Sequence, residues 1–210
     1  MTRSKLFAKL AIGTLLLCGG GQWACAAPVL ASAATWTSGT VIHEYVLYAD
    51  PEIAWNDASA WVGSNLADFH LATITDAAEQ NFINGSIFAN RDGEYWLGGF
   101  QNPIGTREPT ANWTWVTGEP WSYVNWRCCE PNDNYGPGSE QYLAGNWTDA
   151  KMWNDEGLLS YIAGFVAERT SSAAEPATIL LFGIGLAALA GGRGSRKHRW
   201  ARGSGAAREV

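Results

Sequence analysis

Cysteine is scarce in this chain of 210 residues, and its four cysteines fall into two widely separated pairs. Cys18 and Cys25 lie in an N-terminal segment with the features of a secretion signal, so an exported form would keep only Cys128 and Cys129. One adjacent pair cannot form the disulfide framework that often stabilises exported domains of this size. Stability must therefore come from a hydrophobic core, with bound metal as a further source.

The pair Cys128 and Cys129 admits several states. The two residues could form a strained vicinal disulfide, stay as two free thiols or bridge two chains, and redox tuning of the loop that follows would be the functional consequence. We favour the simpler interpretation of two small buried residues, because free cysteine is among the most buried residue types.

Basic residues are also scarce in the central region. Residues 35–175 hold 19 acidic and 5 basic residues, a net charge of −14. Such an acidic region is a poor partner for nucleic acid and a good one for cations. The histidines His43, His70 and His198 are scattered without the spacing of a zinc site, and no Ser/His/Asp or phosphate-loop motif occurs. We therefore expect a protein that is not an enzyme.

No uninterrupted apolar run reaches the roughly 20 residues that span a bilayer. Three basic residues precede an apolar stretch over residues 10–18, and the small-x-small triplets 24–26 and 31–33 are candidate cleavage sites. We predict a signal peptide over residues 1–26, with cleavage as late as residue 34.

A second apolar stretch lies near the C-terminus. A Ser/Ala linker over residues 170–176 leads into an apolar segment of 14 residues at 177–190, and a basic cluster begins at Arg193. An apolar segment followed by basic residues is typical of a stop-transfer sequence with its basic side inside the cell. We predict a short transmembrane helix over residues 177–192 and a basic cytoplasmic tail over residues 193–210.

Aromatic residues are abundant between these two ends. Ten of the 12 tryptophans lie from Trp36 to Trp153, which indicates a folded domain with a large apolar core. Asp76 and Glu79 have the spacing of a helix capping box, and residues 102–146 are rich in Gly, Pro and Asn, as in long loops. Local patterns predict a strand at 44–48, a helix at 54–66, a strand at 71–75, a helix from Asp76, strands at 95–100 and 113–115, and a closing strand at 160–169. This order predicts an α+β domain over residues 35–169.

Hard oxygen donors gather in the last third of the domain. Carboxylate and amide oxygens are the ligands that Ca²⁺ prefers, and it accepts about six to eight of them. The candidate metal ligands are Glu130, Asn132, Glu140, Asn154 and Asp155. Glu130 and Glu140 could also be the acid pair of a glycosidase, but coordination of an ion explains both and removes the free acid. Asp133 could serve an auxiliary calcium, although Gln141 stands where another acid would help.

The order of these motifs resembles the C-type lectin-like domain over roughly residues 45–168. The resemblance rests on Trp55-x-Asp57-Ala58 followed by Leu71-Ala72-Thr73-Ile74, Glu79-Gln80-Asn81-Phe82-Ile83, Tyr95-Trp96-Leu97-Gly98, Glu130-Pro131-Asn132 with Glu140, Trp153-Asn154-Asp155, and Gly164-Phe165-Val166-x-Glu168. It implies the lectin-like fold of two helices, small antiparallel sheets and a long calcium-binding loop region. The family's four cysteine positions fall near Val62, Tyr142, Leu158 and Ala167, which indicates a variant without disulfides.

The same resemblance implies what the site binds. It implies one Ca²⁺ on the five candidate ligands, a cis bond between Glu130 and Pro131, and a carbohydrate with equatorial 3- and 4-hydroxyls, as in mannose or glucose. The sugar hydroxyls would be met by the Glu130/Asn132 and Glu140/Asn154 pairs, with Tyr135 and Trp147 as aromatics that could stack on a ring. Two alternatives stay open: a lectin-like domain that binds a protein partner, and a structural component of an extracellular polysaccharide matrix.

The C-terminal segment is similar to a second family, the PEP-CTERM sorting tail of Gram-negative bacteria. Glu175-Pro176-Ala177-Thr178 matches its motif, although Ala174 stands where the first proline is expected and the stretch after Arg199 is long. The resemblance implies transient anchoring in the inner membrane and processing by an exosortase-like sorting enzyme. The expected location is the cell surface or an extracellular, exopolysaccharide-containing matrix.

Overall fold

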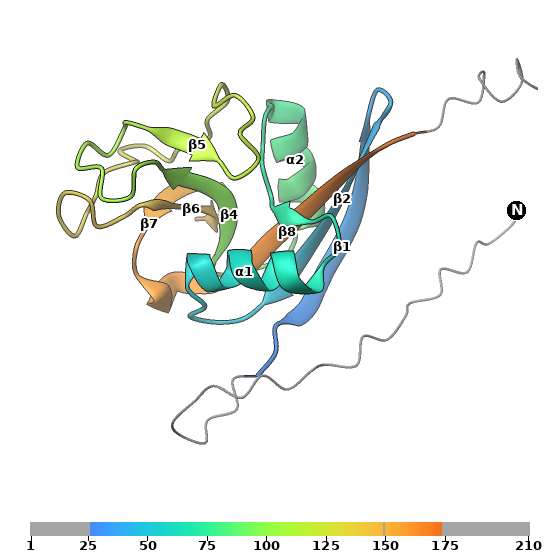
Figure 1. The fold of residues 1–210 in the computed structure, drawn as a ribbon, viewed down its shortest axis with the longest axis horizontal. Helices are drawn as coiled ribbons and strands as arrows, with labels where there is room; N and C mark the ends of the chain where they lie inside the picture. The colour runs from blue at the N-terminus through green and yellow to red at the C-terminus, as the bar shows by residue number, and fades with distance from the viewer. Residues whose placement is uncertain (1–25, 149, 174–210) are drawn as a thin grey trace, which may run out of the picture. The chain divides into compact units, whose positions relative to one another are not determined.

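The computed structural model describes residues 26–148 and 150–173, which Figure 1 shows as a coloured ribbon. The expected transmembrane helix, basic tail and nearly all of the expected signal peptide lie outside these ranges. Within the described residues, no helix is both long enough and apolar enough to cross a bilayer.

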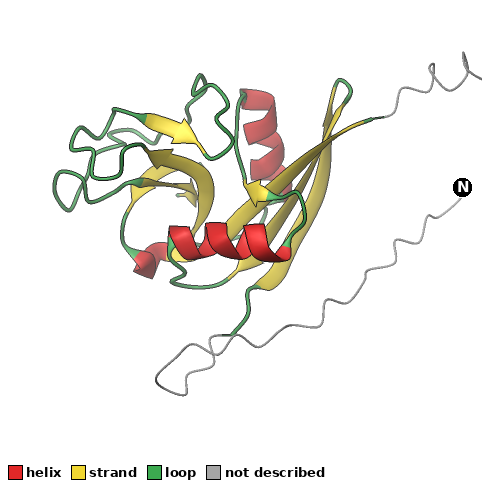
Figure 2. Cartoon of the chain, in the orientation of Figure 1, coloured by secondary structure: helices red, strands yellow, loops and turns green. Residues whose placement is uncertain are grey.

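Two α-helices and an eight-stranded sheet make up the described domain (Figure 2). The sheet runs in the order β1-β2-β8-β4-β6-β7, β3 pairs with β8, and β5 pairs with β4. Only β4 and β8 pair in parallel among these neighbours, and the other pairs are antiparallel. The elements are β1 (Val29–Ser38), β2 (Val41–Ala49), α1 (Trp55–Asn65), β3 (His70–Leu71), α2 (Ala77–Ser86), β4 (Glu94–Gln101), β5 (Trp113–Trp115), β6 (Tyr142–Trp147), β7 (Met152–Glu156), the short 3₁₀ helix η1 (Leu159–Tyr161) and β8 (Ile162–Ser172).

Both helices begin and pack as their sequences predict. In α1, Trp55, Ala58 and Val62 recur at helical spacing and are the buried residues of the helix. Asp76 caps α2, because its carboxylate accepts hydrogen bonds from the backbone N–H groups of Ala78 and Glu79. The predicted capping box is only half formed, since the Glu79 carboxylate turns toward the core instead of reaching back to Asp76.

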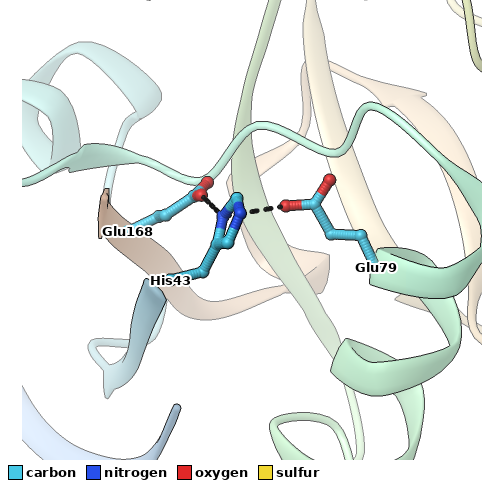
Figure 3. Close-up of side chains that lie close together, drawn as sticks. All are labelled: His43, Glu79 and Glu168. Carbon is cyan, nitrogen blue, oxygen red and sulfur yellow. Dashed lines mark hydrogen bonds and ion pairs between the residues drawn. The ribbon is translucent and has the colours of Figure 1, made fainter. Parts of the chain in front are cut away.

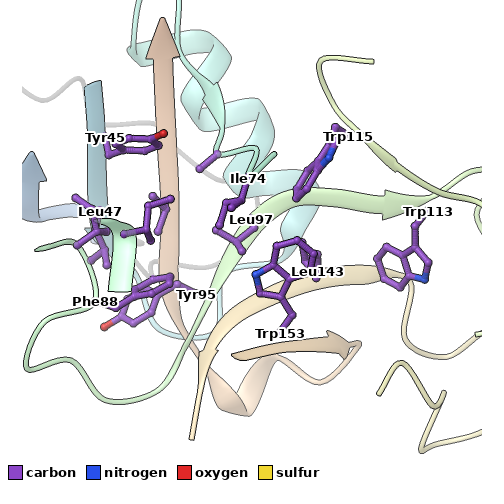
Figure 4. Close-up of a cluster of buried hydrophobic side chains, with 14 residues drawn as sticks. Tyr45, Leu47, Ile74, Phe88, Tyr95, Leu97, Trp113, Trp115, Leu143 and Trp153 are labelled. Carbon is purple, nitrogen blue, oxygen red and sulfur yellow. The ribbon is translucent and has the colours of Figure 1, made fainter. Parts of the chain in front are cut away.

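The core is unusually rich in tryptophan, and Figure 4 shows part of it. Trp153 of β7 is fully buried and meets the rings of Trp115, Trp126 and Tyr123 nearly edge-on. Its Nε1–H donates to Gln80 of α2 at 2.8 Å. Because this large ring is fully buried and packs edge-on against three other aromatic rings, Trp153 is the residue that fixes β7 to the rest of the domain.

Close packing between strands depends on one glycine of the central strand. The Gly98 N–H donates to the Ala72 carbonyl at 2.7 Å, and a Cβ at this position would lie 2.5 Å from the Leu71 carbonyl oxygen. A side chain here would push β3 and β4 apart, which explains the glycine in the Tyr95–Gly98 motif.

The α+β prediction is confirmed, although local patterns missed several elements. Residues 142–147 form the interior strand β6, although the sequence predicts loop there. The edge strand β1 was also not predicted, because its residues coincide with the end of the expected signal segment. Cleavage as late as residue 34 would remove the first half of β1, whereas cleavage after Ala26 would leave it whole.

Candidate functional site

One cavity of about 350 Å³ gathers most of the candidate site residues. This volume lies within the usual range for small-ligand pockets. Six of the seven candidates line it, and the seventh, Asp155, lies beneath the loop that forms one wall. The lining residues are Glu94, Glu130, Asn132, Asn134, Tyr135, Glu140, Trp147, Asn154, Glu156 and Tyr161.

Backbone pairing brings the two halves of the site together. The Trp153 N–H donates to the Asn125 carbonyl at 2.9 Å, and the Arg127 N–H donates to the Trp153 carbonyl at 3.0 Å. These bonds lay the segment before Glu130 alongside β7, which carries Asn154 and Asp155. The Glu130–Pro131 peptide bond is cis, as expected.

Asp155 holds the loop that follows this proline. Its carboxylate accepts hydrogen bonds from the backbone N–H groups of Asn132 and Asp133, at 2.9–3.0 Å. The Glu140 carboxylate in turn accepts the N–H of Asn134. The buried carboxylates are therefore tied to the backbone that shapes the cavity.

Asp133 has a structural task. Its side chain is buried and accepts hydrogen bonds from the N–H groups of Gly138, at 2.8 Å, and Glu140, at 3.0 Å. Gln141 is committed as well, because it bonds Gln101, Gly105 and the Thr106 carbonyl. Both side chains stabilise the loop through these hydrogen bonds. The bonds give no support to an auxiliary calcium at this point.

Among the described residues that line the cavity, no lysine, arginine or histidine accompanies its acids. Burial, more than their mutual repulsion, raises the pKa of Glu94 and of Glu140 to about 7. Burial also raises the pKa of Glu130 and of Asp155 above their usual ranges. In addition, Glu130 Oε2 is buried without any hydrogen-bond partner. An unpartnered buried carboxylate oxygen among other hard donors fits a divalent cation such as Ca²⁺.

Four lining residues were not among the sequence candidates: Glu94, Asn134, Glu156 and Tyr161. Glu156 follows Asn154 by two positions on a strand, so the alternation of side chains placed it on the same face. Glu94 is an acid at the first position of a buried strand, and an acid in such a place is itself a sequence signal of a functional residue. Tyr161 had no local signal, because its 3₁₀ helix was not predicted.

The two cysteines differ from the expectation. Cys128 and Cys129 are both exposed and free, with their sulfur atoms 3.1 Å apart, so the interpretation as two small buried residues is wrong. They occupy the middle of the turn in which the Glu130 N–H donates to the Arg127 carbonyl, and this turn stands clear of the core.

A second group of titratable side chains lies in the fold, and Figure 3 shows it. His43 of β2 lies between Glu168 of β8, at 2.7 Å, and Glu79 of α2, at 3.6 Å. No local sequence signal indicated this group, since its members are up to 125 positions apart. Their ligand atoms lie within 4.8 Å of one another, as in a metal site.

The chain itself satisfies the acceptors of this group. The second oxygen of Glu168 accepts the Thr73 N–H at 3.1 Å, the second oxygen of Glu79 accepts the Thr75 N–H at 2.7 Å, and the Tyr45 hydroxyl donates to Glu79. The histidine thus supplies the positive charge that two buried carboxylates need. This arrangement supports an ion-pair network that joins β2, β8 and α2.

We expect the stability contributed by His43 to depend on pH. The hydrogen bond to Glu168 raises the pKa of His43 above its ordinary value of 6.5. The contribution should therefore be complete below about pH 6.5 and lost as pH rises through the higher folded-state pKa. In urea unfolding, His43→Gln should cost roughly 1.5 kcal/mol at pH 5.5, the order of a hydrogen bond to a charged group, and less at pH 9. A cost independent of pH would show that His43 acts only through packing.

Comparison with known proteins places this chain in a family. A model described as the Lectin C-type domain matches residues 53–159. The chain is 33% identical over 97 residues to Ladderlectin of Oncorhynchus mykiss, covering 45% of this chain and 44% of that protein. It is 28% identical over 116 residues to a lectin of Pleurodeles waltl, covering 54% of this chain and 63% of that protein. The chain spans about half the length of these curated relatives.

Solved structures agree on the fold. The cow C-type carbohydrate-recognition domain of CD23, crystallised in the presence of a GlcNAc2Man3 oligosaccharide, aligns with a TM-score of 0.50 at 23% identity, over 66% of this chain and 95% of that one. Human lithostathine aligns with a TM-score of 0.51 at 21% identity, over 65% of this chain and 88% of that one. At these identities the likeness shows the shared fold.

Proposed function

Because the chain belongs to the C-type lectin domain family, we propose that it binds a carbohydrate through one Ca²⁺ ion in the acidic cavity. Members of this family generally bind carbohydrate, typically with calcium, and do not catalyse a reaction. The proposed ligands of the ion are Glu130, Asn132, Glu140, Asn154 and Asp155. The observation that carries the proposal is the buried, unpartnered Glu130 Oε2 within a cavity of hard donors whose described lining contains no basic side chain.

The proposed sugar is of the mannose or glucose type. When bound, the ion offers open coordination positions to two adjacent hydroxyl groups. The Glu130 carboxylate would accept a hydrogen bond from one hydroxyl, and the Asn132 side-chain amide would donate a hydrogen bond to the oxygen of the same hydroxyl. This amide is free to do so, because it makes no hydrogen bond to the rest of the described chain. Tyr135 and Trp147 line the cavity, and their rings would contribute apolar surface to the sugar site.

The first experiment measures retention on mannose and galactose resins with calcium or with EDTA. We expect retention on mannose that EDTA abolishes. Retention that persists in EDTA, or no binding on a broad glycan array, would contradict the proposal. A protein partner that is captured and not displaced by monosaccharide would favour the alternative of a protein-binding domain.

A double substitution tests the geometry of the site. Exchanging acid and amide, Glu130→Gln with Asn132→Asp, reverses the hydrogen-bond polarity offered to the sugar. We expect preference to shift from mannose toward galactose by about tenfold, which corresponds to ~1.4 kcal/mol. The conservative Asn134→Gln, at the cavity wall, serves as the control and should keep the original preference. Unchanged preference in a double variant that still binds calcium would count against this geometry.

We further propose that the protein is exported by a Gram-negative bacterium and sorted to its surface or matrix through its C-terminal segment. The proposal is supported by the charge pattern of the two ends and by the Glu175-Pro176 motif. Single-site lectin affinity is weak, so many copies on one surface would supply the avidity that adhesion needs. Mass spectrometry of the exported form would show loss of the segment after Pro176 if an exosortase-like enzyme removes it.

A further inference from the structure

Two buried carboxylates of the cavity lie outside the proposed set of calcium ligands. Glu94, the first residue of β4, is 5% exposed, and Glu156, the last residue of β7, is 2% exposed. Both lie against Asn154, whose side-chain N–H group donates to Glu94 Oε2 at 3.2 Å and to Glu156 Oε2 at 3.4 Å. The three side chains form one wall of the cavity.

This wall offers acceptors and almost no donors to a ligand. An amide has two N–H bonds, and Asn154 directs them at the two carboxylates, so neither is free for a sugar hydroxyl. Glu156 Oε1 accepts the N–H groups of Gly157, at 2.8 Å, and Leu158, at 2.6 Å. Glu94 Oε1 accepts no hydrogen bond from the described part of the chain and, unlike Glu130 Oε2, is not sealed from solvent, so it stays open to a ligand in the cavity. A ligand that brings donors can therefore hydrogen-bond to this oxygen.

The charge of the cavity points to a cationic donor. Five carboxylates lie in or directly beneath it, and one Ca²⁺ compensates two of their charges. None of the described lining residues is lysine, arginine or histidine. The guanidinium of Arg127 is held over the Trp147 ring, 4.6 Å from its centroid, and is not part of the lining. A ligand with a positive charge is therefore favoured over a neutral one, and an acidic sugar is disfavoured.

We propose that Glu94 and Glu156 form an acidic subsite for the free ammonium group of an amino sugar. The protein would then prefer hexosamine units that carry no N-acetyl group. The inference rests on the proposed function, because the 3- and 4-hydroxyls would hold the same sugar at the calcium ion. In such a sugar the 2-amino group stands on the carbon next to the one that bears the 3-hydroxyl, which brings it beside the hydroxyl-binding position. An ammonium brings three donors and no acceptor, whereas an N-acetyl group carries no charge and adds a carbonyl acceptor.

The test compares the methyl glycosides of glucosamine, N-acetylglucosamine and glucose by titration calorimetry at pH 7 in saturating calcium. We expect glucosamine to bind at least ~10-fold tighter than glucose, with N-acetylglucosamine no better than glucose. The advantage of glucosamine should shrink as salt is raised, because screening weakens charge pairs. Equal affinities for glucosamine and glucose would overturn the subsite and leave calcium-dependent sugar binding intact, whereas no binding of any of the three sugars would overturn both.

Two isosteric variants locate the effect. Glu94→Gln and Glu156→Gln should each remove most of the glucosamine advantage in a protein that still binds calcium and glucose. Glu52→Gln removes the same charge from an exposed position before α1 and should keep the full advantage. If Glu94→Gln or Glu156→Gln instead abolishes calcium binding, the carboxylates belong to the ion and the ammonium subsite is excluded.

Discussion

Removing calcium is expected to lower the melting temperature as well as abolish sugar binding. The cavity loop is held by carboxylates, and those carboxylates repel one another when no cation is present. The part of the chain that the structure describes contains no disulfide that could hold the loop instead. At a calcium concentration 100 times the dissociation constant, binding adds about 2.7 kcal/mol to the free energy of unfolding. For a domain of this size that corresponds to a rise of roughly 5–10 °C, measurable by calorimetry with calcium and with EDTA.

Two variants serve as controls for the effect of calcium on the melting temperature. Glu130→Gln should melt at nearly the same temperature with and without calcium, because it removes the proposed ligand whose oxygen lacks a partner. Glu44→Gln should keep the full calcium effect. Glu44 is a partly exposed acid of β2 that pairs with Arg169 of β8, and these strands lie farther along the sheet. Identical melting of the unsubstituted protein in calcium and in chelator would show that packing alone holds the loop.

Replacing Trp153 by alanine is expected to cost about 3–5 kcal/mol of stability, the usual range for deleting a large buried aromatic. The Trp153 ring is fully buried between Trp115, Trp126 and Tyr123, so little of the space can close. The substitution should also weaken calcium binding, because the next two residues, Asn154 and Asp155, belong to the proposed calcium site. Urea unfolding followed by circular dichroism measures the first effect, and calcium titration measures the second.

Matched variants separate burial from hydrogen bonding at this position. Trp153→Phe keeps an aromatic ring but leaves the Gln80 oxygen without its donor, so a smaller cost of about 1–3 kcal/mol is expected. Val124→Ala, at a side chain that is 50% exposed on the neighbouring loop, should change stability by less than about 0.5 kcal/mol. A Trp153→Ala protein with unchanged stability and calcium affinity would mean that β7 is positioned without this side chain.

The fold was largely predictable because its signals are local. Helical spacing in residues 54–66 and the Asp76 cap each depend on a few neighbouring residues, and the structure has both helices there. The interior strand β6 was missed because its sequence, Tyr142–Trp147, contains alanine, glycine and asparagine, which are depleted in strands. Pairing with β4 and β7 on both sides stabilises this strand in spite of its composition.

The candidate site was predictable only as far as its motifs run along the chain. Glu130 and Asn132 are neighbours, and Asn154 and Asp155 are neighbours, so each pair could be identified from sequence alone. The presence of Glu94 beside Asn154 could not be, because 60 positions separate them. Likewise the sequence left Asp133 open as a residue for an auxiliary calcium, and only the loop geometry shows its carboxylate bonded to two backbone N–H groups.

The sequence by itself determined the family, the acidic character of the domain and the order of hard oxygen donors, since these reside in composition and in short motifs. The tertiary structure decided which side chains share a cavity: it brought Glu94 and Glu156 to Asn154, His43 to Glu79 and Glu168, and left Cys128 and Cys129 at the surface. The physical reason is that strand order in the sheet, and not distance along the chain, sets which residues face each other. Burial in those shared places then sets the charge and hydrogen bonding that a ligand meets.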